Sequence, residues 1–85
     1  MLRDLQKTQY VVGLKQLRRA LSEGRIARVI LAENAEARVL DPVLEACREQ
    51  DIPIDWAPTM AELGKACRIE VGAAAVGVLS APEKS

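Results

Sequence analysis

The stretch VVGLKQLRRAL, residues 11–21, combines residue types suited to binding a polyanion. On a helical wheel of ~100° per residue its leucines share one narrow arc, and Lys15, Gln16 and Arg19 fall on the opposite face. Gly13 precedes the helix and lets the N–H groups of the first turn meet an anion without a side chain in the way. Lysine and arginine donate to guanine O6 and N7, and glutamine both donates and accepts. The stretch therefore suits recognition of phosphates and base edges, although an ordinary amphipathic helix with a solvated basic face has the same pattern.

The three residues Ile69, Glu70 and Val71 are a second candidate for contact with a partner. They lie between the end of a predicted helix and the start of a predicted strand, where polar turn residues are usual. Two branched apolar side chains around a carboxylate either fold back onto the core or present an apolar surface to a partner. The residues alone leave these two options open.

Residue types for catalysis or metal binding are scarce. The chain has no histidine, and Cys47 and Cys67 do not form a CxxC motif. A general acid–base or nucleophilic site is hard to assemble from this set, and a zinc site would need scattered ligands. We therefore expect no enzyme activity, no metal and no cofactor, and we expect both cysteines to be buried as small apolar residues.

The length of 85 residues predicts one domain, residues 1–85, with a frayed tail at residues 80–85. No apolar run approaches the ~18 residues that span a bilayer, and the N-terminus lacks the apolar segment of a signal peptide. These observations predict a cytoplasmic protein without a membrane partner.

The formal net charge of zero hides an asymmetry along the chain. Residues 1–28 carry seven basic and two acidic side chains, while residues 29–62 carry two basic and eight acidic ones. A basic segment of this kind can mark a polyanion site. Charges that only solvate helix faces would also produce it.

Apolar patterning predicts alternating strands and helices. We expect strands at residues 10–12, 27–32, 52–57 and 73–79, and helices at residues 14–24, 39–47 and 59–67. Gly24 is placed to end the first helix, Thr59 and Glu62 have the spacing of a capping box, and Pro42 fits only near the first turn of its helix. Strands joined by crossover helices predict an α/β fold with a parallel or mixed sheet covered on both faces. The small residues at 73–75 would let helix backbones approach a central strand.

Four stretches taken together resemble the kink-turn RNA-binding ribosomal-protein family, named after archaeal ribosomal protein L7Ae. They are GLKQLRR at residues 13–19, AENAE at 32–36, LGKAC at 63–67 and IEVGAAAV at 69–76. The resemblance covers residues 5–80 and is strongest to the small bacterial members. It implies a single-domain α/β/α sandwich with a mixed four-stranded sheet.

The resemblance also implies the site, a surface for a sharply bent RNA with tandem sheared G·A pairs. Lys15, Gln16 and Arg19 would contact these pairs and the flanking phosphates in the opened major groove, which ordinary A-form RNA hides. Glu36 would lie near the nucleotide thrown out of the kink. The loop of residues 69–71 would pack apolar surface against that nucleotide.

This chain departs from the family pattern at several of these positions. The archaeal motif is Gly-x-Asn-Glu-x-x-Lys, so only Gly13 matches it directly. Gln16 replaces a carboxylate that accepts hydrogen bonds from guanine, which predicts a different affinity or RNA choice. Arg68 replaces a glycine at a position that needs positive φ, and it could add a phosphate contact. Ala37 stands where proline is common.

The resemblance therefore implies a non-catalytic, ribosome-associated RNA-binding protein that recognises and stabilises kink-turns. Its partner would be structured RNA containing a kink-turn, such as ribosomal RNA, and a monomer suffices for a site of this size. The alternative is a protein-interaction module that uses the loop of residues 69–71, and the neutral net charge favours it mildly. Binding that ignores RNA and responds only to changes in the loop would identify the alternative.

Overall fold

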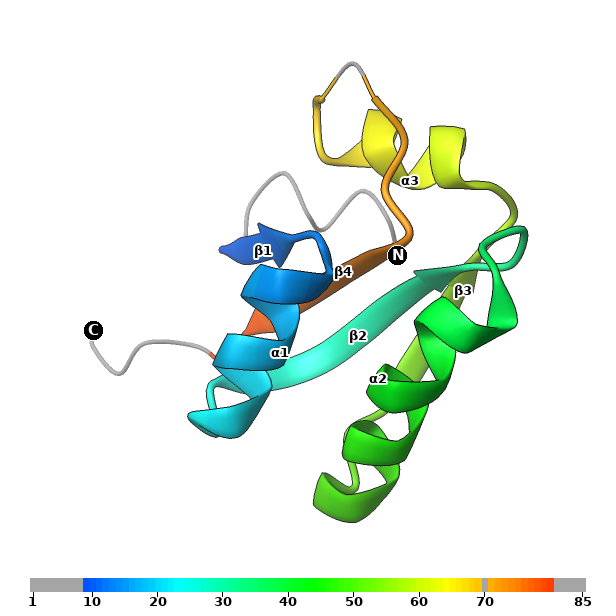
Figure 1. Ribbon diagram of the computed structural model, residues 1–85. Coiled ribbons are helices and arrows are strands. Elements are labelled where there is room, and N and C mark those ends of the chain that lie inside the picture. Colours follow the sequence, from blue (N-terminus) through cyan, green and yellow to red (C-terminus); the bar gives the residue numbers. More distant parts are fainter. Residues whose placement is uncertain (1–8, 70, 81–85) are drawn as a thin grey trace.

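The structure is a computed structural model that describes residues 9–69 and 71–80. Strands and helices alternate in the predicted order (Figure 1). Along the chain they are β1 (Tyr10–Val12), α1 (Leu14–Ser22), β2 (Ile26–Ala32), α2 (Ala37–Gln50), β3 (Ile54–Ala57), α3 (Met60–Ala66) and β4 (Ala75–Leu79). The strands form one sheet in the order β1-β4-β2-β3. β4 is antiparallel to β1 and β2, and β2 is parallel to β3, so the sheet is mixed.

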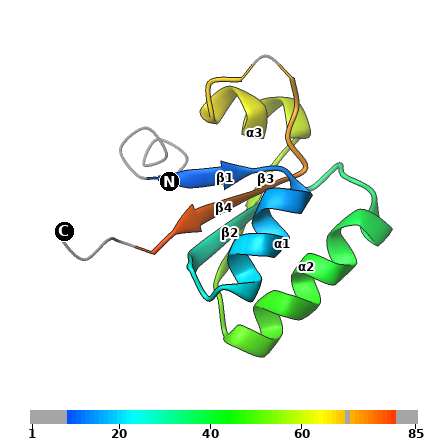
Figure 2. The same ribbon diagram turned by 60° about the vertical axis from the view of Figure 1, so that its left-hand side comes forward.

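The two faces of the sheet are covered by different helices (Figure 2). Val29 and Leu31 of β2 pack with α1 and α2, whereas Ile30 and Ala32 pack on the other side with α3. All four side chains are fully buried. A strand buried on both faces needs no polar alternation, which explains the continuous apolar run in its sequence. The predicted α/β/α sandwich with a mixed four-stranded sheet is confirmed.

The small residues before β4 lie close to α3. The expectation that a strand begins at Ala73 is wrong, because β4 begins at Ala75 and the N–H of Ala73 donates to the carbonyl of Met60 at 3.0 Å. A Cβ on Gly72 would lie 3.1 Å from the Cβ of Met60. This contact shows why small residues precede the strand: α3 packs directly against the backbone there. The strand β3 likewise begins at Ile54, two residues later than predicted.

The first helix ends as the position of Gly24 predicts. Gly24 has a φ of 69°, and its N–H donates to the carbonyl of Leu21. The N–H of Arg25 donates to the carbonyl of Ala20 at 3.0 Å. These two bonds form a Schellman motif, in which a residue with positive φ follows the helix.

The second helix is longer than its apolar pattern indicated. It spans Ala37–Gln50, so Pro42 lies in its second turn, and the expectation that this proline sits near the first turn is wrong. Proline has no N–H to give to the carbonyl of Arg38, four residues earlier. Arg38 is exposed, so water can replace the missing donor. The extra turns are mostly exposed and polar, and for this reason hydrophobic periodicity does not reveal them.

Several smaller expectations also have structural outcomes. The N–H of Glu62 donates to the Thr59 hydroxyl at 3.0 Å, which confirms Thr59 as the cap of α3. Of the predicted tail at residues 80–85, only Ser80 is described, and its N–H donates to the carbonyl of Arg25 at 2.7 Å. No helix within residues 9–69 and 71–80 is long and apolar enough to cross a membrane.

Both cysteines are buried in the core, as expected. Cys47 packs on the side of α1 and α2, and Cys67 packs on the side of α3. Burial raises the pKa of both thiols above the ordinary value, because desolvation disfavours the thiolate. Since the thiolate is the reactive form, neither thiol is activated for nucleophilic chemistry.

Candidate nucleic-acid interface

The sheet topology brings three sequence stretches to one end of the molecule, the right-hand end in Figure 2. Because β4 runs antiparallel to β1 and β2, it begins where those two strands end. The N–H of Gly13 donates to the carbonyl of Ala75, and the N–H of Ala32 donates to the carbonyl of Ala74, both at 3.0 Å. The start of α1, the turn at residues 33–36 and the segment that enters β4 therefore lie around the same edge.

The start of α1 is built on Gly13. This residue has φ 97° and ψ 153°, and α1 has no side-chain cap. A Cβ at Gly13 would meet nothing within 4 Å, so the backbone conformation and not lack of space demands glycine. The first N–H groups of a helix have no partner inside the helix. The N-terminus of α1 thus presents backbone N–H donors together with the positive end of the helix dipole.

The predicted polar face of α1 is exposed, as its periodicity implies. Leu17 is fully buried, while Lys15, Gln16 and Arg19 are exposed. Arg19 lies 3.7 Å from a carboxylate oxygen of Glu23, in a pair that is open to solvent. Such surface pairs contribute only about 0–1 kcal/mol, so Arg19 can exchange this partner for a phosphate at little cost.

The turn at residues 33–36 connects β2 with α2 and also contacts α3. The N–H of Glu33 donates to the carbonyl of Ala57 at 2.8 Å, and the side-chain oxygen of Asn34 accepts from the N–H of Met60 at 2.8 Å. Glu36 is exposed at the start of α2, 3.5 Å from Arg38. The sequence motif contained Asn34, but its hydrogen bond to the first residue of α3 could not be read from the sequence.

The end of α3 confirms that Arg68 occupies a position with positive φ. Its φ is 61°. The N–H of Arg68 donates to the carbonyl of Lys65, and the N–H of Ile69 donates to the carbonyl of Gly64. This is a second Schellman motif, with arginine where glycine is the usual residue. The motif directs the chain out of α3 into residues 69–74.

Arg68→Gly is expected to raise the free energy of unfolding by about 0.5–1 kcal/mol, because the left-handed conformation is unfavourable for a residue with a Cβ. Urea denaturation measures the change as a shift in midpoint at constant slope. Arg68→Ala is the matched control, since it removes the same charge but keeps the Cβ. Equal stabilisation by both variants would show that charge, not backbone strain, is the cause.

The two options for the loop at residues 69–71 are both realised, by different residues. Ile69 is partly buried and packs with the core beneath α3, whereas Val71 is 70% exposed. Glu70 lies outside the described residues. Val71 is therefore the more exposed of the two described apolar side chains in this loop, and Ile69 keeps part of its surface accessible.

Gly64 fixes the distance between α3 and this loop. A Cβ built on Gly64 would overlap the carbonyl oxygen of Val71 and would lie 3.1 Å from the Cα of Gly72. Glycine inside a helix usually lowers stability relative to alanine, so its presence in LGKAC is explained by this close approach.

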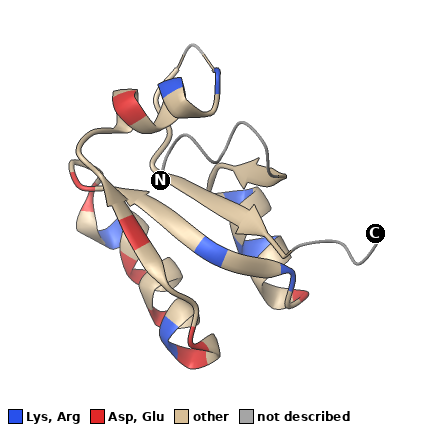
Figure 3. Ribbon diagram, turned by 180° about the vertical axis from the view of Figure 1, so that it is seen from behind, with Lys and Arg blue, Asp and Glu red and all other residues tan. Residues whose placement is uncertain are grey.

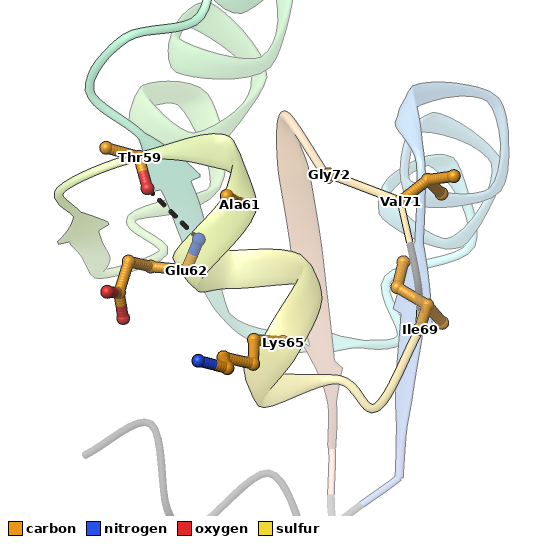
Figure 4. Close-up of a pocket in the computed structure, with 7 residues that line it drawn as sticks. All are labelled: Thr59, Ala61, Glu62, Lys65, Ile69, Val71 and Gly72. Carbon is orange, nitrogen blue, oxygen red and sulfur yellow. Dashed lines mark hydrogen bonds between the residues drawn. The ribbon is translucent and has the colours of Figure 1, made fainter.

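A hollow of about 370 Å³ is lined by α3 and by Ile69, Val71 and Gly72 (Figure 4). Thr59, Glu62 and Lys65 lie on its helix side, and Ile69 and Val71 lie on its loop side. The sequence pattern indicated only a capping role for Thr59 and Glu62 and no role for Lys65. The periodicity of α3 signals which residues are exposed, but only the path of the loop creates the hollow.

The charge asymmetry of the sequence is visible mainly on α1, whose ribbon is mostly basic among its charged positions (Figure 3). Basic side chains gather on α1, where Lys15, Arg18 and Arg19 are exposed. The second helix is mixed in charge, with the exposed acidic residues Asp41, Glu45 and Glu49 beside Arg38 and Arg48. Within residues 9–69 and 71–80, no group of histidine, cysteine, aspartate and glutamate side chains could hold a metal ion. The exposed cations of α1 and the N–H groups at its N-terminus together suit an anionic partner.

The fold and the site together define a class of protein. It is an α/β/α sandwich with a cationic helix and an apolar loop at one end of its sheet. Residues 2–85 match the model of the Ribosomal protein L7Ae/L30e/S12e/Gadd45 family, and the chain belongs to that family.

Small bacterial proteins are among its relatives. An RNA-binding protein of Geobacillus sp. (strain WCH70) is 48% identical over 75 residues, which cover 88% of this chain and 92% of the relative. The RNA-binding protein YbxF of Geobacillus stearothermophilus is 45% identical with the same coverage. Among solved structures, the 15.5kD RNA binding protein of Giardia lamblia has a TM-score of 0.82 at 16% identity, covering 96% of this chain and 70% of its own. That structural match concerns the fold alone.

Proposed function

We propose that this protein binds RNA and that its target is the kink-turn, which it stabilises without catalysis. The observation that carries the proposal is that two surfaces flank the edge of the sheet where β1 ends and β4 begins, where the N–H of Gly13 donates to the carbonyl of Ala75. One is the exposed set Lys15, Gln16 and Arg19 on α1, and the other is the loop that exposes Val71. Membership of the family and relatives named as RNA-binding proteins support an RNA partner.

In this proposal α1 contacts the sheared G·A pairs. Lys15 and Arg19 donate to guanine O6 and N7 or to phosphates, and Gln16 pairs with a base edge through its amide. Gly13 allows the RNA backbone to approach the N–H groups that begin the helix. A-form RNA keeps its major groove too narrow for side chains. The kink widens this groove, so the side chains of α1 can enter it.

The second surface contacts the nucleotide that the kink extrudes. Glu36 can accept from base N–H groups, and Ile69 and Val71 offer apolar contact to the base. Glu70, in the same loop, faces this nucleotide in the proposal, and Arg68 contacts a neighbouring phosphate. We propose further that the protein acts in the cytoplasm on ribosomal or other structured RNA, as a monomer.

The test is a pair of RNA duplexes that differ only in the G·A pairs. One contains a kink-turn, and in the other the sheared pairs are replaced by Watson–Crick pairs. Titration of the protein is expected to give tight binding to the first and weak, salt-sensitive binding to the second. Equal weak binding to both would contradict the proposed function.

Arg19→Ala is expected to weaken binding and to lower the slope of log K against log salt by up to about one unit, because one phosphate contact is lost. The measurement is a titration of the kink-turn RNA at several salt concentrations. Arg48→Ala, which removes an exposed cation from α2, is the control and should leave the slope unchanged. An unchanged slope in Arg19→Ala would remove the phosphate contact from the proposal.

The second candidate function is a protein-interaction module, favoured by the exposure of Val71. A partner protein would contact this apolar side chain and ignore the cations of α1. Binding of a partner that is abolished by Val71→Ala and unaffected by Arg19→Ala would identify this function.

A further inference from the structure

The outer edge of β3 has backbone groups that no described strand covers. The sheet order β1-β4-β2-β3 places β3 at the edge, with β2 as its neighbour among the described residues. The carbonyls of Pro53 and Ala57 accept hydrogen bonds of 3.0 and 2.8 Å from β2 and from the residue that follows it. Because backbone groups alternate in direction along a strand, the N–H and carbonyl groups of Ile54 and Trp56 point to the free edge. A further strand could pair with them.

The side chain of Trp56 lies at this edge. It is 45% exposed, and Val71 is the other exposed large apolar side chain among the described residues. Ile54 packs with the core on the side of α1 and α2, and alternation along the strand places Trp56 on the same face. Leu44 of α2 packs there too and is partly buried. The indole ring therefore offers a flat apolar surface at the rim of the sheet, beside α2.

The flank of α2 beside this edge carries a carboxylate close to the level of Trp56. The amide of Gln50 donates to the carbonyl of Leu21 at 2.9 Å, which marks the flank of α2 that faces α1. At ~100° per residue, Asp41 and Arg48 both fall on the opposite flank. The first turns of α2 lie at the end of the sheet where β2 and β3 end, because α2 follows β2 and the two strands are parallel. Asp41 is therefore at the Trp56 end of β3, and Arg48 is at the other end.

The charge of the surrounding segment favours a cationic partner. Residues 33–62, which run from the turn after β2 into α3, carry eight acidic and two basic side chains. This excess repels phosphates, and a second copy of the chain would bring the same charge to the edge. An arginine or lysine side chain, in contrast, gains both the carboxylates and a cation–π contact with a tryptophan ring. Pro53 and Pro58 flank β3, so the strand that pairs with it must be short.

We propose that the β3 edge binds a short extended segment of a partner protein, rich in arginine or lysine, as an added strand. The backbone of the segment pairs with the outward N–H and carbonyl groups of Ile54 and Trp56, as in other cases of strand addition. One of its cationic side chains lies across the Trp56 ring and pairs with the Asp41 carboxylate. This surface differs from α1 and the loop at residues 69–71, and the inference does not require that the protein binds RNA.

The test is a titration with a synthetic hexapeptide in which arginine and valine alternate. Trp56 is the only tryptophan of the chain, so its fluorescence reports occupation of the edge. Binding should change this fluorescence and slow the amide hydrogen exchange of Ile54 and Trp56, because their N–H groups become hydrogen-bonded. A peptide with glutamate in place of arginine should not bind.

Two further peptides carry N-methyl groups on one or the other alternate set of amides. One set faces β3 and the other faces away, so one methylated peptide should lose binding and the other should keep it. Equal affinity of the two would contradict strand addition. A change of Trp56 fluorescence with kink-turn RNA but not with the peptide would assign the surface to RNA instead.

Protein variants test the side chains, with binding followed by the anisotropy of a dye on the peptide. Trp56→Thr keeps a residue that favours strands and should weaken binding about tenfold. Asp41→Asn, an exposed change that leaves the fold intact, should weaken it about threefold and reduce its salt dependence. The matched controls are Glu23→Gln beside α1 and Val71→Ala, and both should bind the peptide like the wild type. Wild-type affinity in Asp41→Asn and Trp56→Thr would overturn the proposal.

Discussion

A Gly13→Ala variant is expected to have a free energy of unfolding about 2 kcal/mol lower than that of the wild type. It is also expected to bind kink-turn RNA at least tenfold more weakly. At φ 97° and ψ 153°, Gly13 occupies a region that is essentially restricted to glycine, and residues forced there cost roughly 1–3 kcal/mol. Its N–H donates to the carbonyl of Ala75, and its carbonyl accepts from Leu17, both at 3.0 Å. Relaxation of the strain must disturb one of these bonds and so move the first turn of α1.

The consequence for binding follows from what that turn carries. Lys15 and Gln16 lie in it, so a small rotation moves both side chains and the N–H groups beside them. Free energies of unfolding from urea denaturation and affinities from RNA titration check the two effects. Titration is done at a temperature at which the variant is folded.

The matched control for this prediction is Gly24→Ala at the opposite end of α1. Gly24 has a φ of 69°, and an added methyl group would meet nothing within 4 Å, so strain again arises from the backbone. We expect stability to fall by about 1 kcal/mol with no change in RNA affinity. Wild-type affinity in Gly13→Ala would contradict the role of the α1 terminus in binding.

Gly64→Ala is the second change with a large expected effect. Alanine is the better helix former by about 1 kcal/mol, but its methyl group would overlap the carbonyl oxygen of Val71. Overpacking of this kind typically costs about 1–3 kcal/mol, and here the group that must move is backbone. We expect a net loss of about 1 kcal/mol in stability and at least a tenfold loss in RNA affinity, because the loop at residues 69–72 is displaced.

Gly77→Ala is the control for Gly64→Ala. Its added methyl group would meet the side-chain ends of Leu17, Ile26 and Val11, which pack on the side of α1 and can shift without moving the backbone. This variant should lose stability and bind RNA with near wild-type affinity at a temperature where it is folded. If Gly64→Ala binds as well as Gly77→Ala, the position of the loop does not control recognition.

Local features of the site were readable from the sequence. The exposed face of α1 follows from the spacing of its leucines, and the positions of Gly24 and Thr59 follow from the chemistry of helix ends. The positive φ at Arg68 was expected from the glycine usual in the family, and it is observed. The boundaries of α2, β3 and β4 were not predicted correctly. The residues added to α2 are exposed and mostly polar, so they leave no apolar period. The starts of β3 and β4 depend on pairing with β2, which local propensity does not record.

The sequence by itself determined the order of helices and strands, the buried face of α1 and the residue types available for an anionic partner. These depend on interactions between residues close in the chain, which repeat with the period of a helix or strand. Only the tertiary structure decided that Ile69 turns inward while Val71 is exposed, that Gly64 packs against the loop, and that α3 encloses a hollow. These features depend on the sheet order β1-β4-β2-β3, which brings residues from separate stretches into contact that no local pattern records.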